Sequence, residues 1–414
     1  MIKKMETSGG SNFGSSLRRG ASGASGKRMK IIQVGKGKYR GSTSATLQRA
    51  VDAVAAAGGG AVEIPNGNYR MANALYLRGG VDIYAEGQVV LQKVPSVSSP
   101  IADYLGYGHY EFTVTQPSKF QVGMGVHLTD RNAMGFYETV ATITGKQGNI
   151  LFIDRMLNHD YHPHAEGRAS TIFPLVAGHA VRDVKVRGLT LDGNPRETRA
   201  LNGCRGGGVF LLDCHNIELQ ALEVRNYHGD AISFQQCTDL QVIGCHLHDN
   251  RGSGLHPGSG SVRYIFRGNR VQHNSGCGLY YCLRTKYSLC EDNVLEANGL
   301  AGISIGERDT HHLIRGNTIA GNGGPGILFR PITHQGGDDV LIENNRLERN
   351  CQSEQGEEIA LTAGLKNVWI SGNCVNDRRQ PRQRTKRLTG PTAVPGDAAR
   401  HLHIAKLAPW HSLA

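Results

Sequence analysis

Residues 269–298 read NRVQHNSGCGLYYCLRTKYSLCEDNVLEAN, and the same layout returns before and after this stretch. An asparagine recurs at intervals of 24 residues and finally of 28, at Asn226, Asn250, Asn274, Asn298, Asn322 and Asn350. A second series keeps similar intervals, at Asn269, Asn293, Asn317, Asn345 and Asn373. Fixed periods of roughly 20–50 residues are typical of solenoids, in which each repeat packs on its neighbours. The sequence therefore predicts a repeat architecture.

The content of each repeat favours strands over helices. A helical repeat would need longer segments with apolar residues at a 3.6-residue period. These repeats instead hold short alternating segments divided by Gly and Asn, such as IEL (217–219), ISI (303–305) and VWI (368–370). Asparagine tolerates left-handed backbone, and its amide can bond the asparagine of the next coil. We therefore expect an all-β fold, a right-handed parallel β-helix with three short strands in each coil.

Other segments depart from this pattern. Residues 46–57 have helical periodicity before a Gly triplet, so we expect a helix that caps the open N-terminal end of the solenoid. A segment with period-two alternation and turn residues predicts a small antiparallel insertion. The expected organisation is a basic tail (1–30), the cap and first coils (31–101), a β-rich insertion (102–172), the main coils (173–375), and a basic linker with a C-terminal cover (376–414).

The formal net charge of +11 is concentrated at the ends of the chain. Residues 1–40 carry ten Lys or Arg against one acidic residue, and residues 376–414 carry eight against two. The body between them carries 28 basic and 32 acidic side chains, whereas nucleic-acid-binding domains concentrate basic charge on the folded surface. Nucleic acid is therefore not an expected partner, and both ends are interpreted as solvated segments.

Composition excludes several further classes of protein. No run of eighteen apolar residues occurs, which argues against a membrane-spanning helix and a membrane partner. The 55 glycines show no Gly-X-Y period, which excludes collagen. The opening residues lack the apolar stretch of a standard signal peptide, so we expect a cytoplasmic protein or one exported by an unrecognised route. The nine cysteines include no Cys-x-x-Cys pair, and we expect mostly free, buried thiols.

The stretch DAVAAAGGGAVEIPNGNY (52–69), together with the repeats, resembles the pectate-lyase-like superfamily of right-handed β-helices. The resemblance covers roughly residues 30–375 without the insertion. GLHPGSGS (254–261) and the similar segments after it look like bacterial right-handed parallel β-helix repeat proteins. The resemblance implies the fold, whereas the chemistry of the superfamily ranges over lyases, hydrolases, epimerases, phage spikes and adhesins.

The repeat spacing also predicts which side chains of successive coils are neighbours. Six residues after each asparagine of the first series lie Ile232, His256, Tyr280, Ser304 and Leu328. The flanking positions are mostly apolar and side chains alternate across a strand, so this column is expected to face solvent. Coils lie about 4.8 Å apart, which makes His256 and Tyr280 neighbours. Ile232 fits the column poorly, which indicates a one-residue slip of register at Asp230.

Charged and small side chains are expected beside this pair. Arg284 and Arg308 occupy equivalent positions of successive coils, Glu307 adjoins Arg308, and Arg330 lies one coil further. Small residues would keep the floor of a groove open beneath an extended polymer. The predicted substrate-binding residues are Arg251, Ser259, Ser304 and Arg330.

These groups suit β-elimination from a uronic acid. Arginine would neutralise the sugar carboxylate and so acidify the C5 proton. His256 or Tyr280 would remove that proton, and the other would protonate the leaving oxygen. Epimerisation needs the same groups and returns a proton to the opposite face. The predicted partner is an acidic polysaccharide, and the predicted catalytic residues are Asp230, His256, Tyr280, Arg284, Glu307 and Arg308.

Two other functions stay open. The chain resembles polygalacturonase-type hydrolases in fold, and hydrolysis would use Asp230 and Glu307, which lie three coils or roughly 14 Å apart. The aspartate pair and the Gly-His-Gly of those hydrolases are absent as such. A non-catalytic saccharide-binding or structural solenoid, monomeric or homotrimeric, would carry an aromatic stripe, which the aromatic residues of this chain do not form.

Structural explanations compete with each catalytic role, and no cofactor is predicted. His256 can be a solvated histidine, Tyr280 part of a surface ladder, and Asp230 a turn residue bonded to its own backbone. The pairs His246/His248 and His311/His312 are expected to face solvent and not to form a metal site. Calcium has no support from the sequence, because no acidic cluster can be assembled on the groove.

Overall fold

The computed structural model describes residues 30–376 except 134, 198, 332–334, 352–356 and 363. The predictions for the basic N-terminal tail and for the linker and cover after residue 376 lie outside the described residues.

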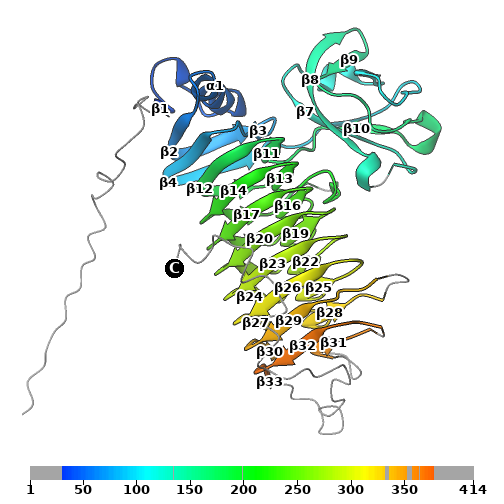
Figure 1. Ribbon diagram of the computed structural model, residues 1–414. Coiled ribbons are helices and arrows are strands. Elements are labelled where there is room, and N and C mark those ends of the chain that lie inside the picture. The colour runs from blue at the N-terminus through cyan, green and yellow to red at the C-terminus, as the bar shows by residue number, and fades with distance from the viewer. Residues whose placement is uncertain are drawn as a thin grey trace, which may run out of the picture.

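Short parallel strands stack in three columns along a solenoid axis (Figure 1). The first column contains β12 (Arg182–Asp192), β14 (His215–Gln220), β17 (Thr238–Ile243), β20 (Val262–Arg267), β23 (Lys286–Glu291), β26 (Thr310–Arg315), β29 (Val340–Glu343) and β32 (Val368–Ser371). The second contains β15 (Glu223–Arg225), β18 (His246–His248), β21 (Arg270–Gln272), β24 (Val294–Glu296), β27 (Thr318–Ala320), β30 (Arg346–Glu348) and β33 (Cys374–Asn376). The third contains β3 (Leu75–Tyr76), β11 (Val176–His179), β13 (Val209–Leu212), β16 (Ile232–Gln235), β19 (Leu255–Gly258), β22 (Leu279–Tyr280), β25 (Ile303–Ile305), β28 (Ile327–Phe329) and β31 (Ile359–Ala360). The predicted parallel β-helix is confirmed.

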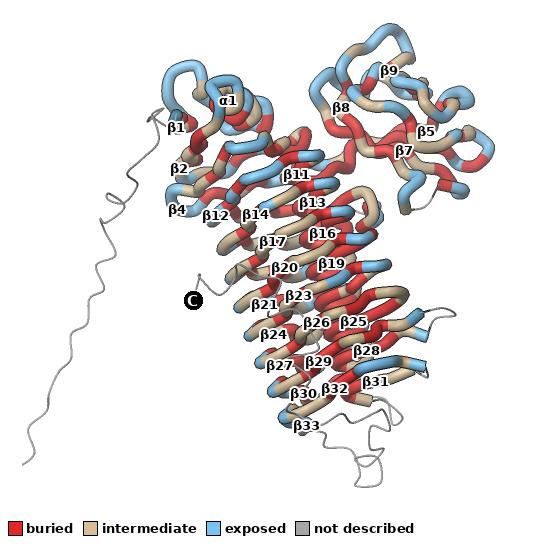
Figure 2. The backbone as a smooth tube through the Cα atoms, viewed as in Figure 1, coloured by how far each residue is buried: buried red, intermediate tan, exposed pale blue. Residues whose placement is uncertain are grey.

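Each coil buries the inward side of its strands, and several strands of the third column, such as β16, β19 and β25, are buried on both sides (Figure 2). In β25, for example, Ile303 and Ile305 point into the solenoid and pack in its continuous hydrophobic core. Because one coil cannot bury its inner face alone, the core exists only through stacking.

The asparagines form two ladders inside the turns, as the repeat predicts, except that Asn226 lies outside them, because the N–H of Tyr227 donates to Oδ1 of Asn250 in its place. The backbone N–H of Asn293 donates to Oδ1 of Asn317 at 2.9 Å, and its amide Nδ2 donates to the same oxygen and to the carbonyl of Phe266, each at 2.9 Å. The same pattern joins Asn298 to Asn322. The ladders thus satisfy backbone groups that the turns leave without strand partners.

The first coils contain β4 (Val81–Lys93), which pairs in parallel with β12, and β2 (Gly60–Met71), on which β1 (Lys30–Gln33) stacks. The N-terminal end of the solenoid is covered by α1 (Ser44–Ala55). Thr43 caps the helix, because its Oγ1 accepts the N–H of Thr46 at 3.4 Å. The buried face of the helix, which includes Leu47, Val51 and Val54, packs in the solenoid core. The predicted capping helix is confirmed and begins and ends two residues earlier than expected.

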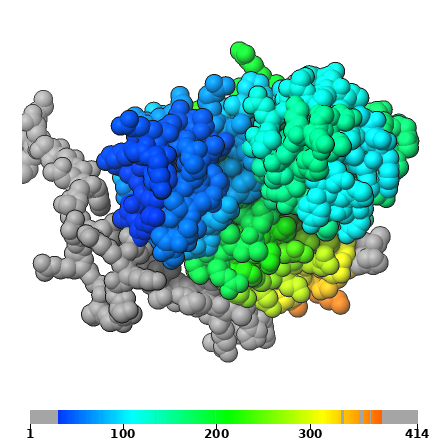
Figure 3. Space-filling view, turned by 90° about the horizontal axis from the view of Figure 1, so that it is seen from above, coloured from blue at the N-terminus to red at the C-terminus, as the bar shows by residue number. Residues whose placement is uncertain are grey.

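The insertion is a small antiparallel sheet with its own core. Its strands are β5 (Ser98–Pro100), β6 (Glu111–Thr113), β7 (Gly125–Thr129), β8 (Thr139–Gln147), β9 (Ile150–Ile153) and β10 (Arg168–Ser170). Seen from above, the insertion lies beside the N-terminal coils at one end of the solenoid (Figure 3). Short 3-10 helices occur at Gly37–Tyr39, Pro117–Lys119, Gly135–Tyr137 and Pro163–Ala165.

The described part of the chain can be compared with the expectations for membrane-spanning helices and for cysteines. None of its helices has the length and apolar character needed to cross a bilayer. All nine cysteines are unpaired, and five of them are buried, as expected for free structural thiols.

Candidate functional site

Asp230 and His256 form a buried pair on the outward side of the third column. Ser233 of β16 pairs in register with His256 of β19, so the predicted one-residue slip at Asp230 is confirmed. The slip brings the carboxylate to the imidazole, and Oδ2 of Asp230 lies 2.6 Å from Nδ1 of His256. The other carboxylate oxygen accepts the N–H of Ser253 at 2.5 Å. Asp230 is therefore both a turn residue bonded to backbone and the partner of His256.

The expectation that this column faces solvent is wrong for His256, which residues before β13 cover, and for Ser304, which is bonded to Arg330; Tyr280 and Leu328 of the same column are partly exposed. His256 is 6% exposed, and Ser233 and Ser304 are also buried. The carbonyl of Gly203 accepts the Ser233 hydroxyl at 2.5 Å, and a Cβ at Gly203 would lie 1.9 Å from Oδ2 of Asp230. Only a glycine backbone can approach the pair this closely. We call residues 199–207 the Gly203 segment.

Tyr280 and Arg330 complete what we call the His256 site, defined as Asp230, His256, Tyr280 and Arg330. The rings of His256 and Tyr280 meet edge to face with centroids 5.2 Å apart, as the repeat spacing predicted. The guanidinium of Arg330, which follows β28, lies 4.3 Å from the centre of the Tyr280 ring. Tyr280 is half-buried, so the site is reached from the side of this residue.

Local bonds hold Arg330 in place over the tyrosine. Its guanidinium donates to Oγ of Ser304 at 2.8 Å and to the carbonyl of Tyr281 at 2.7 Å, and it lies 3.6 Å from the buried Asp309 carboxylate. A Cβ at Gly306 would lie 1.8 Å from Nη2 of Arg330. The glycine of this coil therefore makes room for the guanidinium.

Burial and charge set the protonation of the site. Burial opposes the charged form of His256, but the Asp230 carboxylate outweighs it and raises the pKa of His256 to about 10. Burial also raises the pKa of Tyr280, and the Arg330 guanidinium counteracts part of that rise. At neutral pH the site thus holds an imidazolium–carboxylate pair and a neutral phenol. One ring nitrogen of His256, Nε2, is buried without a hydrogen-bond partner among the described residues.

Two thiols lie near this imidazole. The neighbouring Cys204 thiol and burial raise the pKa of Cys282, and Cys204 belongs to the Gly203 segment. A thiol with a raised pKa is a poor nucleophile. This argument applies to Cys282 alone, because the same contact with Cys282 lowers the pKa of Cys204.

Other predicted site residues lie on turns. Arg284 and Arg308 have left-handed backbone, with φ of 60° and 56°. Arg308 donates to Glu307 at 2.5 Å, and neither arginine contacts His256 or Tyr280 among the described contacts. The expectation that these two arginines stack beside the His/Tyr pair is thus wrong, and Arg330, predicted as a substrate-binding residue, takes that place.

The remaining predicted substrate contacts do not converge on one surface. Ser304 is buried and bonded to Arg330, and Ser259 is buried on the turn after β19. Arg251 lies exposed on the turn that follows Asn250. The expectation for His311/His312 is partly wrong, because His312 is fully buried and bonded to Ser288 at 2.8 Å.

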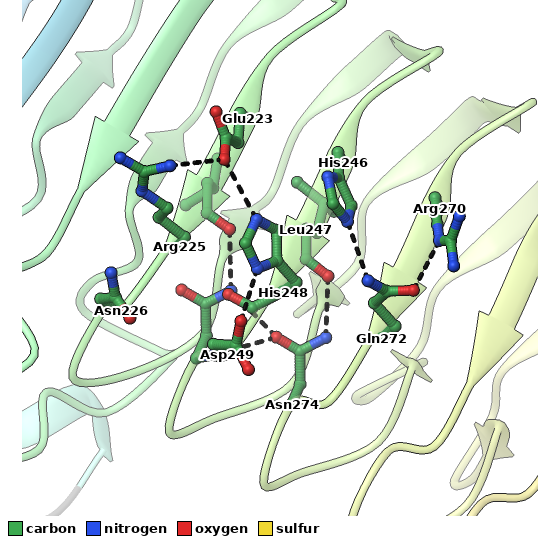
Figure 4. Close-up of polar contacts among 12 residues, drawn as sticks. Glu223, Arg225, Asn226, His246, Leu247, His248, Asp249, Arg270, Gln272 and Asn274 are labelled. Carbon is green, nitrogen blue, oxygen red and sulfur yellow. Dashed lines mark hydrogen bonds and ion pairs between the residues drawn. The ribbon is translucent and has the colours of Figure 1, made fainter.

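A second group of side chains gathers on the second column, where the sequence predicted no site. One ligand atom each from Glu223, His246 and His248 lie within 4.8 Å of one another (Figure 4). These three residues could hold a metal ion. The signal in the sequence was the pair of histidines two residues apart in a strand, with a glutamate one coil, 23 residues, before His246.

The Gly203 segment was missed for a different reason. It belongs to a non-periodic connection between β12 and β13, and the repeat spacing says nothing about where such a connection lies. The glycine cluster CRGGG (204–208) was the one visible sign that backbone approaches closely there.

Comparison with known proteins agrees with this fold. Residues 176–330 match the sequence family described as "Right handed beta helix region". No curated protein matches the sequence. Among solved structures, the chain is similar to the A-module of mannuronan C-5 epimerase AlgE4 from Azotobacter vinelandii, with 19% identity and a TM-score of 0.49 over 81% of this chain and 84% of that one.

Two further solved structures have comparable scores. Alginate lyase from Paenibacillus sp. str. FPU-7 has 11% identity and a TM-score of 0.48 over 84% of this chain and 98% of that one. The surface adhesin PfbA of Streptococcus pneumoniae has 13% identity and a TM-score of 0.47 over 81% and 76%. Together with the three strand columns and the asparagine ladders, the family match over residues 176–330 identifies the fold of the chain as a right-handed parallel β-helix.

Proposed function

We propose that this protein acts on an acidic polysaccharide and removes the C5 proton of a uronic acid, in β-elimination or in C5 epimerisation. The observation that carries the proposal is the Asp230–His256 pair at 2.6 Å beside Tyr280, with the Arg330 guanidinium 4.3 Å from the tyrosine ring. Removal of a proton next to a carboxylate needs groups that transfer protons and a cation that stabilises the negative charge formed, and this site has both.

The protonation states assign the roles. His256 is an imidazolium up to a pKa of about 10, so it donates a proton or a charged hydrogen bond and does not accept one at neutral pH. Tyr280 is the base once it has lost its phenolic proton; because burial raises its pKa and Arg330 opposes only part of that rise, a higher pH favours this form. Tyr280 takes the C5 proton, the electron pair moves toward the carboxylate, and the C4–O bond breaks as His256 protonates the leaving oxygen. In epimerisation the C4–O bond stays, and solvent water supplies the proton that C5 receives on the opposite face.

Access to His256 requires a movement of the Gly203 segment, which covers it. Tyr280 and Arg330 are partly exposed, whereas Asp230 and His256 lie beneath Gly203. A substrate therefore meets Tyr280 and Arg330 first, and the Gly203 segment has to move before the imidazole reaches the leaving oxygen.

Hydrolysis by Asp230 and Glu307 has less support. Asp230 is occupied by His256 and by the N–H of Ser253, and Glu307 is paired with Arg308. Neither carboxylate faces the other, as the acid and base of a glycosidase do.

The test uses purified protein with polymannuronate, polyguluronate and polygalacturonate. The appearance of ultraviolet absorbance from unsaturated uronate reports elimination, and proton NMR of the recovered polymer reports epimerisation. Tyr280→Phe and His256→Gln should each reduce the rate roughly 10²–10⁴-fold, as expected for loss of a general acid or base. His215→Gln, at a partly exposed histidine of β14, is the matched control and should retain activity. Full activity in both site variants, or no change in any polymer with the wild type, would refute the proposal.

A further inference from the structure

We propose that Glu223, His246 and His248 form a binding site for a divalent transition metal of the Zn²⁺ class, which we call the second-column site. It lies on strands β15 and β18, in a different column from the His256 site, and does not depend on the proposed function.

The strand register builds the site. Glu223 pairs directly with His246 across parallel strands, and His248 lies two residues further on the same outward face. Nε2 of His248 lies 3.2 Å from Oε1 of Glu223, and the two imidazole rings stack with centroids 4.0 Å apart. One ligand atom from each residue lies within 4.8 Å of the other two, so a single ion can reach all three after small side-chain rotations.

Neighbouring groups orient both histidines, as Figure 4 shows. Nδ1 of His248 is held by the Asp249 carboxylate at 2.6 Å, which leaves Nε2 directed at Glu223. A carboxylate behind a histidine is the usual outer-shell partner of a metal ligand.

The second histidine presents a lone pair. Arg270 donates to Oε1 of Gln272 at 2.5 Å, which fixes the amide so that its Nε2 donates to Nε2 of His246 at 3.1 Å. That ring nitrogen is therefore an acceptor, and the amide is the group that a metal would displace.

The donor set selects the metal. Two imidazoles and one carboxylate suit Zn²⁺, Ni²⁺ or Cu²⁺, whereas Ca²⁺ and Mg²⁺ prefer oxygen ligands. Three protein ligands leave one tetrahedral position for water. Two other contacts compete for the glutamate: Arg225 donates to Oε1 at 2.8 Å and Thr190 to Oε2 at 3.0 Å. Metal binding replaces the Arg225 contact, so that arginine limits the affinity.

The experiment is a titration of the full-length chain with Zn²⁺ by calorimetry and with Co²⁺ by visible absorbance. The wild type should bind one equivalent that gives the absorption bands of tetrahedral Co²⁺. His246→Gln and His248→Gln should remove that equivalent and its bands. Asp249→Asn should weaken binding about 10–100-fold through the orientation of His248. Arg225→Gln should tighten binding, since it frees Glu223.

His215→Gln is the matched control for these variants. His215 is a partly exposed strand histidine, and its Nε2 lies 3.6 Å from the Asp213 carboxylate, but within the described part of the chain no third ligand accompanies this pair. This variant should bind like the wild type. Melting temperatures without metal verify that each variant is folded. Absence of tetrahedral Co²⁺ bands, or bands unchanged in His246→Gln, overturns the proposal.

Discussion

The charge on His256 is set by one neighbouring carboxylate. Asp230→Asn should lower the pKa of His256 from about 10 to below its ordinary value of 6.5, because burial remains while the opposing charge is lost. Chemical shifts of the histidine ring carbons, followed against pH by NMR, measure this directly. Tyr280→Phe is the control, because it keeps the carboxylate and the aromatic ring. A pKa that stays near 10 in Asp230→Asn would contradict the assignment.

The same pair links stability to pH. The pKa of His256 is raised in the folded state, so its stabilising contribution is complete below pH 6.5 and is lost as the pH rises through about 10. Each unit of the shift corresponds to about 1.4 kcal/mol. The difference in melting temperature between the wild type and His256→Gln should therefore shrink as the pH rises from 7 toward 10.

The sequence predicts which residues occupy equivalent positions of successive coils better than it predicts where a long side chain reaches. The 24-residue spacing made His256 and Tyr280 neighbours, because strand register follows directly from coil length. It could not choose between Arg308 and Arg330 as the cation beside Tyr280. A long side chain crosses from one coil to the next, and its direction depends on the room left by Gly306 and on the hydroxyl of Ser304.

Among the structural elements, the asparagine ladders depend on side-chain hydrogen bonds that run from one coil to the next. Asn293 is bonded on both sides, since it donates to Asn317 and accepts at Oδ1 from both the N–H and the amide of Asn269. Asn293→Ala should leave several buried groups unpaired, at about 1–3 kcal/mol each. Asn373→Ala, at the end of the same ladder, is the matched control. Asn373 accepts from Asn345 and donates to the carbonyl of Ile342, but it is partly exposed, so water can replace its bonds and the change should cost less.

Calorimetric melting of both variants checks this prediction. Asn293→Ala should lower the melting temperature clearly more than Asn373→Ala. Equal effects would mean that water replaces the ladder bonds in the middle of the solenoid, and that the asparagines serve the left-handed turns more than the stacking.

At the scale of the whole molecule, periodic and non-periodic segments differ in what the sequence can predict. Coils and the capping helix follow from local patterns, and both were predicted. The insertion was recognised as antiparallel strands, but its position beside the first coils could not be predicted. That position depends on a few contacts distant in sequence, such as the N–H of Gly125 bonded to the carbonyl of Ala72 at 3.0 Å.

The two ends of the insertion meet, which allows it to be removed. Val97 and Thr171 exchange hydrogen bonds of 2.9 Å, one from the Thr171 N–H and one to its hydroxyl, so a two-glycine link can join them. The insertion has a separate core, and we therefore expect the variant without residues 98–170 to keep its β-rich circular dichroism and to unfold cooperatively.

Removal of the insertion should also loosen the Gly203 segment, which covers the His256 site. Arg205 in the Gly203 segment donates to the carbonyl of Phe136 in the insertion at 2.9 Å, and this contact ties the cover down. Exchange of backbone amides over residues 199–207, measured by mass spectrometry, should become faster in the shortened variant and in Arg205→Gln, which keeps the insertion. Unchanged exchange in both variants would show that the bonds of Gly203 to Ser233 and Gln235 hold the cover by themselves.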